Sequence, residues 1–407
     1  MLTYAQALDF LFPRTTTIKF GLETTRALLA EVGNPEQVYP TVHVGGTNGK
    51  GSVATLIATV LETAGWKVGL YTSPHLVSFR ERVRVNREPI SESAVAMWTD
   101  RLEPMIRDRG ATFFEATTVI ALSDFASRGV EVAVVEVGLG GRLDSTNVLN
   151  PLVSVVTRIA LDHMKYLGDS LTEIAREKAG IAKPGASFVI GETDPEIVTT
   201  LAIEAKSRMG VEPDIRVVPA DREWDGLLGL AGPHQKRNAA VAEAALLALP
   251  LPYRPREAVI ASGFAQAHIP GRFDRRGKWV FDVAHNPDGM RALVKALREG
   301  DLPRPIHALV SILGDKEWPE MLVQLDAGID RGILTMAPTA AGRGWNIQWL
   351  EEWLNRPDRP PARAAWSLVP DFSQALEAVQ AGAGTVVVTG SFHTVGDVME
   401  TLGMAPI

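Results

Sequence analysis

Short apolar runs alternate with amphipathic helical patterns along most of this 407-residue chain. In the first two thirds of the chain, strands are predicted at 42–44, 67–71, 130–137 and 152–156. Helices are predicted at 3–12, 23–32, 50–61, 92–109 and 112–127. Apolar strands that alternate with helices across short turns are typical of a parallel sheet covered on both faces. The pattern therefore predicts an α/β fold with a doubly wound, mostly parallel sheet.

The alternation restarts near residue 279. Further strands are predicted at 279–282, 306–312, 332–336 and 385–389, and further helices at 289–298, from 319 onward and at 371–380. The turn-forming stretch Pro270-Gly271-Arg272 precedes this restart and marks a junction. We therefore expect an N-terminal domain of residues 1–272 and a smaller, Rossmann-like α/β domain of residues 273–407.

The first apolar run leads into a glycine-rich loop that carries a lysine and a serine. Residues 45–52 read GGTNGKGS, and a helical pattern follows. Glycines let backbone N–H groups face a polyphosphate at a helix N-terminus, a lysine adds positive charge, and a serine hydroxyl can reach Mg²⁺. The common spacing G-x-x-x-x-G-K-[ST] is not met, because residue 44 is Val and Gly51 separates Lys50 from Ser52. We still interpret the stretch as a phosphate-binding P-loop, with a plain glycine turn before a helix as the alternative.

Polar residues also follow the other predicted strands of this domain, namely Thr72-Ser73, Glu136 and Asp162-His163. Ligands of open α/β sheets bind at the carboxyl edge of the strands, where these residues should meet. A carboxylate at the end of an apolar strand is costly to bury without a partner or a cation. With Ser52 and Ser73 expected nearby, Glu136 is interpreted as a Mg²⁺ ligand rather than a capped strand end. His163 is open to both interpretations, as a ligand or as a structural histidine.

Several other residues have a structural and a functional interpretation. From its helical context alone, Lys178 is expected to be a solvated lysine paired with a neighbouring acid. The loop 138–144 is either a connection or a substrate-holding loop. Arg272 at the junction would contact a nucleotide phosphate or form an inter-domain salt bridge. His285 and Ser391 follow strands of the second domain and should face its binding edge.

Composition narrows the function classes. With 48 acidic and 41 basic residues, the net charge is −7, and no basic block is present to neutralise nucleic-acid phosphates. The chain has no cysteine, which excludes disulfides, thiol nucleophiles and thiolate metal sites. The N-terminus lacks a signal-like pattern and no apolar run is long enough for a bilayer, so we expect a cytoplasmic protein with no membrane partner.

Nine motifs in register carry a resemblance over nearly the whole chain. They are GGTNGKGS at 45–52, TSPHL at 72–76, ERVRV at 81–85, EVGLGGRLDSTN at 136–147, LDHMKYLG at 161–168, EKAGI at 177–181, PGRF at 270–273, DVAHNP at 282–287 and TGSFH at 389–393. Together they resemble bacterial bifunctional folylpolyglutamate synthase/dihydrofolate synthase, a member of the Mur ligase superfamily. The resemblance also explains the extra glycine between Lys50 and Ser52, because this family has the sequence G-K-G-S in its P-loop.

The resemblance implies site roles, two Mg²⁺ ions and ATP as the nucleotide. ATP would be held by Gly46, Thr47, Asn48, Gly49, Lys50, Gly51, Ser52, Asn238, Arg272 and Asp282. The metal ligands would be Ser52, Ser73, Glu136 and His163. The pterin would lie against Phe20, Gly21, Leu22, Thr112, Phe113, Phe114, Glu115, Leu143, Asp144 and Ser145, where Ser145 replaces an alanine often seen in the family. Glutamate would meet His285 and Ser391. The catalytic set would be Lys50, Lys178, His163, Arg272 and Asp282, with Lys178 as the family's carbamylated lysine.

The implied activity is an ATP-dependent acid–amino-acid ligase that adds L-glutamate to dihydropteroate and to tetrahydrofolate or its polyglutamates. A substrate carboxylate would attack the γ-phosphate of ATP, and the glutamate amine would then displace phosphate from the acyl phosphate. The family resemblance also implies a monomer. Three alternatives stay open: a synthase limited to polyglutamylation, a muramyl-peptide Mur ligase, and a nucleotide-dependent binding module without turnover. The motifs TSPHL and GGRLDSTN argue against the muramyl ligase.

Overall fold

The computed structural model describes residues 2–210, 212–340, 342–356 and 362–407. The chain divides into two compact units, and each is described by itself. Unit 1 comprises residues 1–75, 79–227 and 237–267, and unit 2 comprises residues 76–78, 228–236 and 268–407. The expected boundary after residue 272 lies close to His268, where the chain passes from unit 1 into the main part of unit 2. The apolar pattern did not predict that the short segments 76–78 and 228–236 belong to unit 2.

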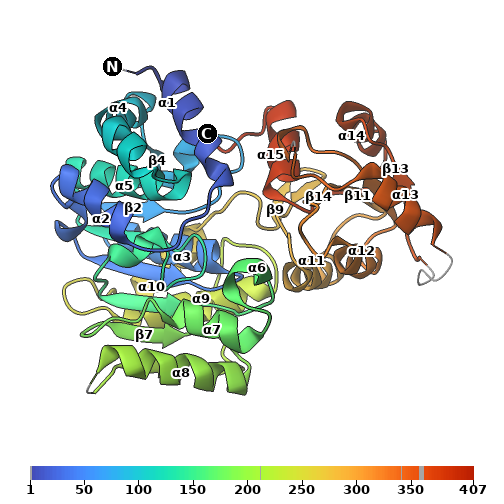
Figure 1. The fold of residues 1–407 in the computed structure, drawn as a ribbon. Coiled ribbons are helices and arrows are strands. Elements are labelled where there is room, and N and C mark those ends of the chain that lie inside the picture. The colour runs from blue at the N-terminus through green and yellow to red at the C-terminus, as the bar shows by residue number, and fades with distance from the viewer. Residues whose placement is uncertain (1, 211, 341, 357–361) are drawn as a thin grey trace. The chain divides into compact units, whose positions relative to one another are not determined.

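Unit 1 contains an eight-stranded sheet in the order β4-β3-β2-β5-β1-β6-β7-β8 (Figure 1). The strands are β1 (Thr41–Gly45), β2 (Val68–Tyr71), β3 (Val83–Val85), β4 (Glu88–Pro89), β5 (Val132–Glu136), β6 (Val153–Val156), β7 (Ser187–Ile190) and β8 (Ile215–Val217). In the part of the sheet ordered β2-β5-β1-β6-β7-β8, every neighbouring pair is parallel. The pairs β2–β3 and β3–β4 at one edge are antiparallel. The mostly parallel sheet is therefore confirmed, with β1 in its interior between β5 and β6.

Helices flank this sheet. They are α1 (Tyr4–Leu11), α2 (Glu23–Glu31), α3 (Lys50–Thr63), α4 (Glu92–Arg109), α5 (Phe113–Ser127), α6 (Met164–Leu167), α7 (Leu171–Ala179), α8 (Pro195–Met209), α9 (His234–Ala248), whose residues from Arg237 on belong to unit 1, and α10 (Glu257–Gln266). Short 3₁₀ turns occur at Phe12–Thr16 (η1), Pro35–Gln37 (η2), Phe79–Arg82 (η3) and Ser145–Val148 (η4). Figure 1 shows α8 alongside α7 and next to β7.

The helix that follows the P-loop lies inside unit 1. All residues of α3 from Gly51 to Leu61 are buried, including Ser52, Thr55 and Thr59, so this helix is buried on all sides and has no solvent-exposed face there. Helix α10 packs directly on it at Gly263, where an added Cβ would lie 2.7 Å from the Val60 Cα atom. Burial on all sides holds the N-terminus of α3 firmly at the end of β1.

Unit 2 contains a six-stranded sheet in the order β13-β12-β11-β14-β10-β9, parallel except for the antiparallel edge strand β9. The strands are β9 (Asp274–Arg276), β10 (Trp279–Phe281), β11 (Ile306–Val310), β12 (Arg331–Leu334), β13 (Ala365–Leu368) and β14 (Thr385–Thr389). The helices are α11 (Pro287–Glu299), α12 (Trp318–Asp326), the 3₁₀ turn η5 (Pro338–Ala340), α13 (Ile347–Asn355), α14 (Phe372–Gln380) and α15 (Phe392–Thr401).

The core of unit 2 has two parts, one on each face of the sheet. Val387 joins the cluster of α11 and α12, whereas its neighbours Val386 and Val388 join the cluster of α14 and α15. Successive strand residues point to opposite faces, so an all-apolar strand serves both clusters. Figure 1 shows α11 and α12 on one side of this sheet and α14 and α15 on the other. The second α/β unit is therefore confirmed.

Among the described residues, no helix combines the length and the apolar character needed to cross a membrane.

Candidate active site

The P-loop lies between the end of β1 and the start of α3 in unit 1. Gly46 and Gly49 have φ values of 139° and 90°, a backbone region that side chains rarely tolerate. An added Cβ at Gly46 would lie 1.9 Å from the Thr157 hydroxyl oxygen. The loop therefore needs glycine at this position for both conformation and space, as the phosphate-loop interpretation requires.

Two side chains at the loop connect to the neighbouring chain segments. The Lys50 Nζ atom donates a hydrogen bond to the Thr47 carbonyl oxygen at 3.0 Å. The Asn238 side chain, from α9, lies against Gly49, where an added Cβ would be 2.6 Å from the Asn238 Oδ1 atom. The structure therefore brings Asn238 to the loop, although nearly two hundred positions separate them in the sequence.

The segment after β6 holds the P-loop in place, and sequence reasoning missed it. The Thr47 N–H donates to the Arg158 carbonyl at 2.7 Å, and the Thr47 hydroxyl exchanges hydrogen bonds with both backbone groups of Ala160, each at 3.1 Å. The Thr157 hydroxyl lies within hydrogen-bond distance of the Asn48 carbonyl at 2.8 Å. A polar residue directly after an apolar strand was the only signal for Thr157. The loop is thus pre-shaped by its own chain.

Lys178 is not a solvated surface lysine, and that interpretation is wrong. Its residue is only 4% exposed, and its Nζ atom donates to the Gly46 carbonyl at 2.8 Å. Burial and then the nearby charge of Lys50 lower the pKa of Lys178 from 10.5 to about 7, whereas Asp162 and Asp144 act in the opposite direction. Burial therefore favours the neutral form of this amine more than water does.

Glu136 and Ser73 meet at the ends of neighbouring strands. Glu136 is the last residue of β5 and is 3% exposed. Its Oε2 atom accepts a hydrogen bond from the Ser73 N–H at 3.0 Å, and it lies in register with Val44 of β1. The parallel order β2-β5-β1 places both residues at the edge where the P-loop begins. Two of the four expected metal ligands are therefore adjacent.

His163 lies in the segment between β6 and α6 and is more exposed than Glu136. It has a left-handed backbone (φ 52°) and precedes α6, with Asp162 beside its ring at 3.9 Å. Among the described residues, no cluster of three or more His, Asp or Glu side chains could hold a metal by itself. Any metal at this edge would therefore take part of its coordination from hydroxyls, water or phosphate oxygens.

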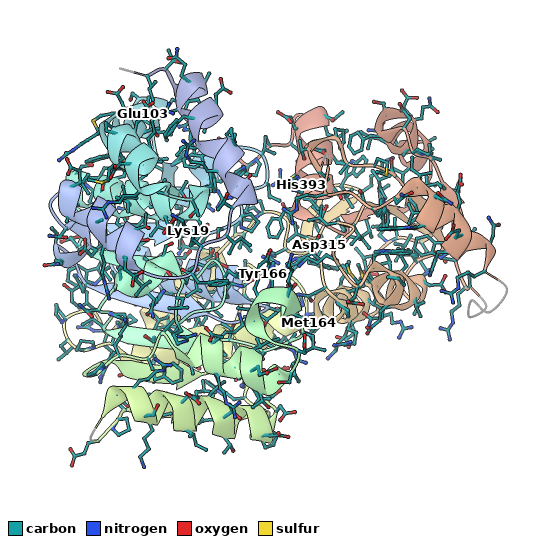
Figure 2. The ribbon with its side chains drawn as sticks, in the orientation of Figure 1. Lys19, Glu103, Met164, Tyr166, Asp315 and His393 are labelled. Carbon is teal, nitrogen blue, oxygen red and sulfur yellow. The ribbon has the colours of Figure 1, made fainter. Side chains whose placement is uncertain are left out.

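The loop with Phe20, Gly21 and Leu22 lies beside α6. The Phe20 ring is half exposed, and its centroid is 6.2 Å from that of Tyr166, which Figure 2 labels on α6. Lys19, also labelled in Figure 2, donates to the carbonyls of Arg109 and Gly110 at the C-terminus of α4. A lysine is favourable at a helix C-terminus, so Lys19 fixes the loop that presents Phe20.

The start of α5 contributes aromatic rings. The Phe114 ring covers Gly138, where an added Cβ would lie 2.3 Å from it, and its centroid is 6.1 Å from that of Tyr71. Phe113 instead packs with its ring against Phe79. Thr112 and Glu115 form a capping box: the Glu115 carboxylate accepts from both the N–H and the hydroxyl of Thr112. Their side chains therefore have a structural use besides the expected one in the pterin pocket.

Asp144 organises the loop after β5. Its carboxylate accepts hydrogen bonds from the Leu139 N–H at 2.8 Å and from the Thr146 N–H at 2.9 Å. The Thr146 hydroxyl also donates to it, and His43 from β1 contacts that hydroxyl at 2.8 Å. Burial raises the pKa of Asp144, and these hydrogen bonds act against that shift. Leu143 and Ser145 flank it, half-buried and buried, and the partners Thr146 and His43 were not anticipated from the sequence.

In unit 2, Asp282 ties the end of β10 to the stretch after Arg272. Its carboxylate accepts from the Phe273 and Ala284 N–H groups, both at 2.9 Å. Burial raises the pKa of Asp282 to about 6, and the positive charge of Arg272 opposes the shift. Burial, followed by Arg272, lowers the pKa of His234 to about 4. Arg272 and Asp282 are therefore electrostatically coupled, as two residues of one nucleotide site would be.

Phe392 gathers the other expected residues of unit 2. Its ring lies 5.6 Å from the His285 ring and 5.3 Å from the Arg272 guanidinium. The His285 Nδ1 atom lies 2.8 Å from the Val283 carbonyl, so Nδ1 carries the hydrogen of this contact. Ser391 caps α15 by accepting from the Thr394 N–H at 3.1 Å. His393, labelled in Figure 2, instead contacts the Thr339 hydroxyl at 2.9 Å.

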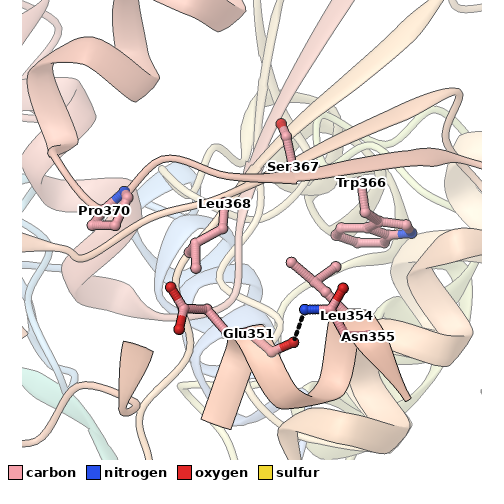
Figure 3. Close-up of a pocket in the computed structure, with 7 residues that line it drawn as sticks. All are labelled: Glu351, Leu354, Asn355, Trp366, Ser367, Leu368 and Pro370. Carbon is pink, nitrogen blue, oxygen red and sulfur yellow. Dashed lines mark hydrogen bonds between the residues drawn. The ribbon is translucent and has the colours of Figure 1, made fainter. Parts of the chain in front are cut away.

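A separate pocket of about 530 Å³ lies between α13 and β13 in unit 2 (Figure 3). Its lining consists of Glu351, Leu354, Asn355, Trp366, Ser367, Leu368 and Pro370. The Asn355 amide donates to the Glu351 carbonyl along its floor. None of these seven residues belongs to the expected site, so the pocket and the expected site are distinct.

Two protein-family models match separate parts of the chain. Residues 44–211 match the Mur ligase middle domain. Residues 271–392 match the family described as Mur ligase, glutamate ligase domain. The first match begins at the end of β1 and includes the P-loop, Glu136, His163 and Lys178. The second includes Arg272, Asp282, His285 and Ser391.

Individual relatives extend the similarity over the whole chain. The Escherichia coli K12 dihydrofolate synthase/folylpolyglutamate synthase is 36% identical over 403 residues, which are 95% of this chain and 92% of that protein. The solved structure of E. coli FolC with DHPP and ADP has a TM-score of 0.86 at 34% identity and covers 99% of this chain and 98% of its own. The Yersinia pestis bifunctional folylpolyglutamate synthase/dihydrofolate synthase with AMPPNP and a Mn ion has a TM-score of 0.83 at 30% identity, with 99% and 98% covered. The chain therefore belongs to the folylpolyglutamate synthase/dihydrofolate synthase family of Mur ligases and is an ATP-dependent folate–glutamate ligase.

Proposed function

We propose that this ligase has both activities of the family: it adds L-glutamate to dihydropteroate and to the γ-carboxylate of tetrahydrofolate or its polyglutamates. The E. coli relative is named for both activities, and the similarity to it covers 92% of that protein. The observation that carries the site assignment is the position of Lys178, which is buried and bonded to the P-loop carbonyl of Gly46. Burial of a lysine is costly, and buried lysines with a strongly shifted pKa are frequent at functional sites.

The reaction would take place in two steps at the P-loop edge of unit 1. The substrate carboxylate attacks the γ-phosphorus of ATP, the bond to the β,γ-bridging oxygen breaks, and an acyl phosphate and ADP form. The α-amine of glutamate then attacks the acyl carbon and phosphate leaves, with loss of one proton from nitrogen. Lys50 and the N–H groups at the start of α3 would hold the phosphates and stabilise the charge that develops on them. Positioning supplies most of the acceleration in such a mechanism.

The donor set fits a magnesium ion. Ser52 and Ser73 bring hydroxyl oxygens and Glu136 a buried carboxylate, and oxygen ligands beside substrate phosphates are what Mg²⁺ prefers. His163 would complete a second site. When bound, the ions would neutralise charge on the phosphates. A Mn ion accompanies the nucleotide analogue in the Y. pestis enzyme, which supports a divalent-metal requirement here.

We further propose that Lys178 is carbamylated. Its lowered pKa makes the neutral amine available, and this amine attacks CO₂ to give a carbamate and a released proton. The product is negatively charged, so the repulsion between Lys178 and Lys50 becomes an attraction. It would act as a carboxylate that orients Lys50 and the metal-bound phosphates.

In unit 2, Arg272 and Asp282 would contact the nucleotide, and His285 and Ser391 the incoming glutamate. Arg272 offers a fork of donors for phosphate oxygens. We take the chain to act as a monomer, which light scattering at assay concentration checks.

The deciding experiment measures phosphate release from Mg-ATP and glutamate with 7,8-dihydropteroate in one assay and tetrahydrofolate in another. Turnover in both supports the two-activity proposal. Turnover with tetrahydrofolate alone leaves a synthase limited to polyglutamylation. Phosphate release with neither substrate, in a folded and ATP-binding protein, overturns the proposal.

A further inference from the structure

A buried histidine lies directly behind the expected pterin pocket. His43 is the middle residue of β1 and is completely buried. Its Nε2 atom lies 2.8 Å from the Thr146 hydroxyl, whereas its buried Nδ1 atom has no hydrogen-bond partner among the described residues. A polar ring in the centre of an apolar strand is costly, so its single contact needs an explanation.

The direction of that contact follows from its neighbours. Both oxygens of Asp144 act as acceptors, Oδ2 from the Leu139 N–H and Oδ1 from the N–H and hydroxyl of Thr146. A carboxylate that only accepts is ionised, and the single hydroxyl hydrogen of Thr146 is therefore committed to Asp144. His43 must then be the donor, with its hydrogen on Nε2. This tautomer leaves Nδ1 as a bare acceptor, which agrees with its missing partner.

The result is a one-way chain of donors from the core of the sheet to the substrate loop. His43 N–H donates to the Thr146 hydroxyl, which donates to the Asp144 carboxylate. Thr146 by itself can rotate its hydroxyl toward other acceptors, and His43 removes that freedom by occupying its lone pair. The free lone pairs of Asp144 then keep one orientation.

We propose that His43 is a positioning residue for the pterin substrate, acting on Asp144 through Thr146. The inference rests on the proposed place of Asp144 in the pterin pocket. An aminopteridine presents N–H donors, and a carboxylate held in one orientation binds them with less loss of freedom. The competing explanation is that His43 only fills the core.

The test compares steady-state KM values for dihydropteroate and for ATP in five variants. His43→Leu removes the donor, and His43→Gln retains an amide N–H at the Nε2 end. Thr41→Val is the matched control, because Thr41 lies on the same face of β1 and its buried hydroxyl has no partner among the described residues. Asp144→Asn tests the pocket assignment itself.

We expect His43→Leu to raise the pterin KM about tenfold, as expected for the loss of one hydrogen bond to a charged system, with the ATP KM within about twofold. His43→Gln should recover most of the pterin affinity, and Thr41→Val should leave both constants unchanged. Thr146→Val removes the hydroxyl between His43 and Asp144 and leaves His43 in place. It should also raise the pterin KM and leave the ATP KM nearly unchanged, and it replaces His43→Leu in the test if that variant does not fold.

Three different results would overturn the inference. If Asp144→Asn raises the pterin KM but His43→Leu and Thr146→Val do not, the relay is irrelevant and only the pocket assignment survives. If Asp144→Asn leaves the pterin KM unchanged, the pocket assignment fails, and the inference fails with it. Equal increases in both KM values for His43→Leu and His43→Gln would identify a purely structural core residue.

Discussion

The Nζ atom of Lys178 donates a hydrogen bond to the Gly46 carbonyl at 2.8 Å, across 132 positions of sequence. This contact attaches α7 to Gly46 of the P-loop. The same burial that makes it possible lowers the pKa of Lys178 to about 7, so the amine is poised between its charged and neutral forms. One residue thus links the structure of the loop to its proposed chemistry.

Removal of the Lys178 side chain should abolish ligase turnover while ATP still binds. The reason is that the proposed carbamate acts on the reacting phosphates and not on the adenine. We expect Lys178→Ala to lose at least about a hundredfold in kcat, of the order seen when one charge-stabilising group is removed. A small carboxylic acid added to the assay should restore part of the rate of Lys178→Ala. With ¹³C-bicarbonate, a carbamate NMR signal should appear in the wild-type protein and not in Lys178→Ala. The control is Lys206→Ala at an exposed lysine, which should keep both turnover and the carbamate signal. A carbamate signal that persists in Lys178→Ala would contradict the assignment.

Lys50→Ala should eliminate phosphate release without unfolding the protein. Lys50 lies at the first position of α3, is only half-buried, and donates to the Thr47 carbonyl at 3.0 Å. Its absence removes positive charge from the phosphate site, which should cost at least about a hundredfold in kcat/KM. Far-UV circular dichroism and the melting midpoint check the fold, and Lys67→Ala, an exposed lysine of the same unit, serves as control. Near-normal activity of Lys50→Ala would contradict the P-loop assignment.

Thr47→Val should weaken both the fold and nucleotide binding. The Thr47 hydroxyl is buried and bonds to both backbone groups of Ala160 at 3.1 Å, and valine leaves those groups without their partner. Unsatisfied buried polar groups cost about 1–3 kcal/mol, so the urea midpoint should fall and the ATP KM should rise. Thr47→Ser, which keeps the hydroxyl, should stay close to the unmodified protein. An unchanged urea midpoint for Thr47→Val would show that the Ala160 contacts contribute nothing.

Acid should destabilise unit 1 through His43. Burial, with the charge of Lys183, lowers the pKa of His43 from 6.5 to about 3, and Asp144 faces it only through Thr146. A lowered pKa means that the unfolded chain binds the proton first, so this contribution is fully present above pH 6.5 and is lost as the pH falls toward 3. At pH 5 the loss should be about 2 kcal/mol relative to pH 7. Urea unfolding of unmodified protein and His43→Gln at both pH values measures it, and an equal acid sensitivity of the two would contradict the buried neutral ring.

Local patterns determined the order of elements in both units. The run at 132–136 is apolar except for its last residue, Glu136, and the run at 385–389 has three valines between Thr385 and Thr389, so both are recognised directly as parallel strands with two covered faces. The P-loop and Glu136 were found because each adjoins an apolar run, and His163 was found because the segment after the run 152–156 leads to it. The strands β7, β8, β9 and β13 and the antiparallel pair β3 and β4 were not predicted. They are short and lie toward the sheet edges, where pairing with a neighbour and not a run of apolar residues defines the strand.

Only the tertiary structure decided the state of individual polar side chains. The sequence shows Lys178 beside Glu177 on a helix, which predicts a solvated ion pair, yet Glu177 pairs with Arg142 at 2.8 Å and Lys178 turns inward. The contacts of His43 with Thr146 and of Thr47 with Ala160 join segments that the order β5-β1-β6 brings together. A hydrophobic pattern tells which side of an element is buried. Which buried partner a hydroxyl, a ring nitrogen or an amine meets depends on strand order, and strand order is a property of the assembled sheet.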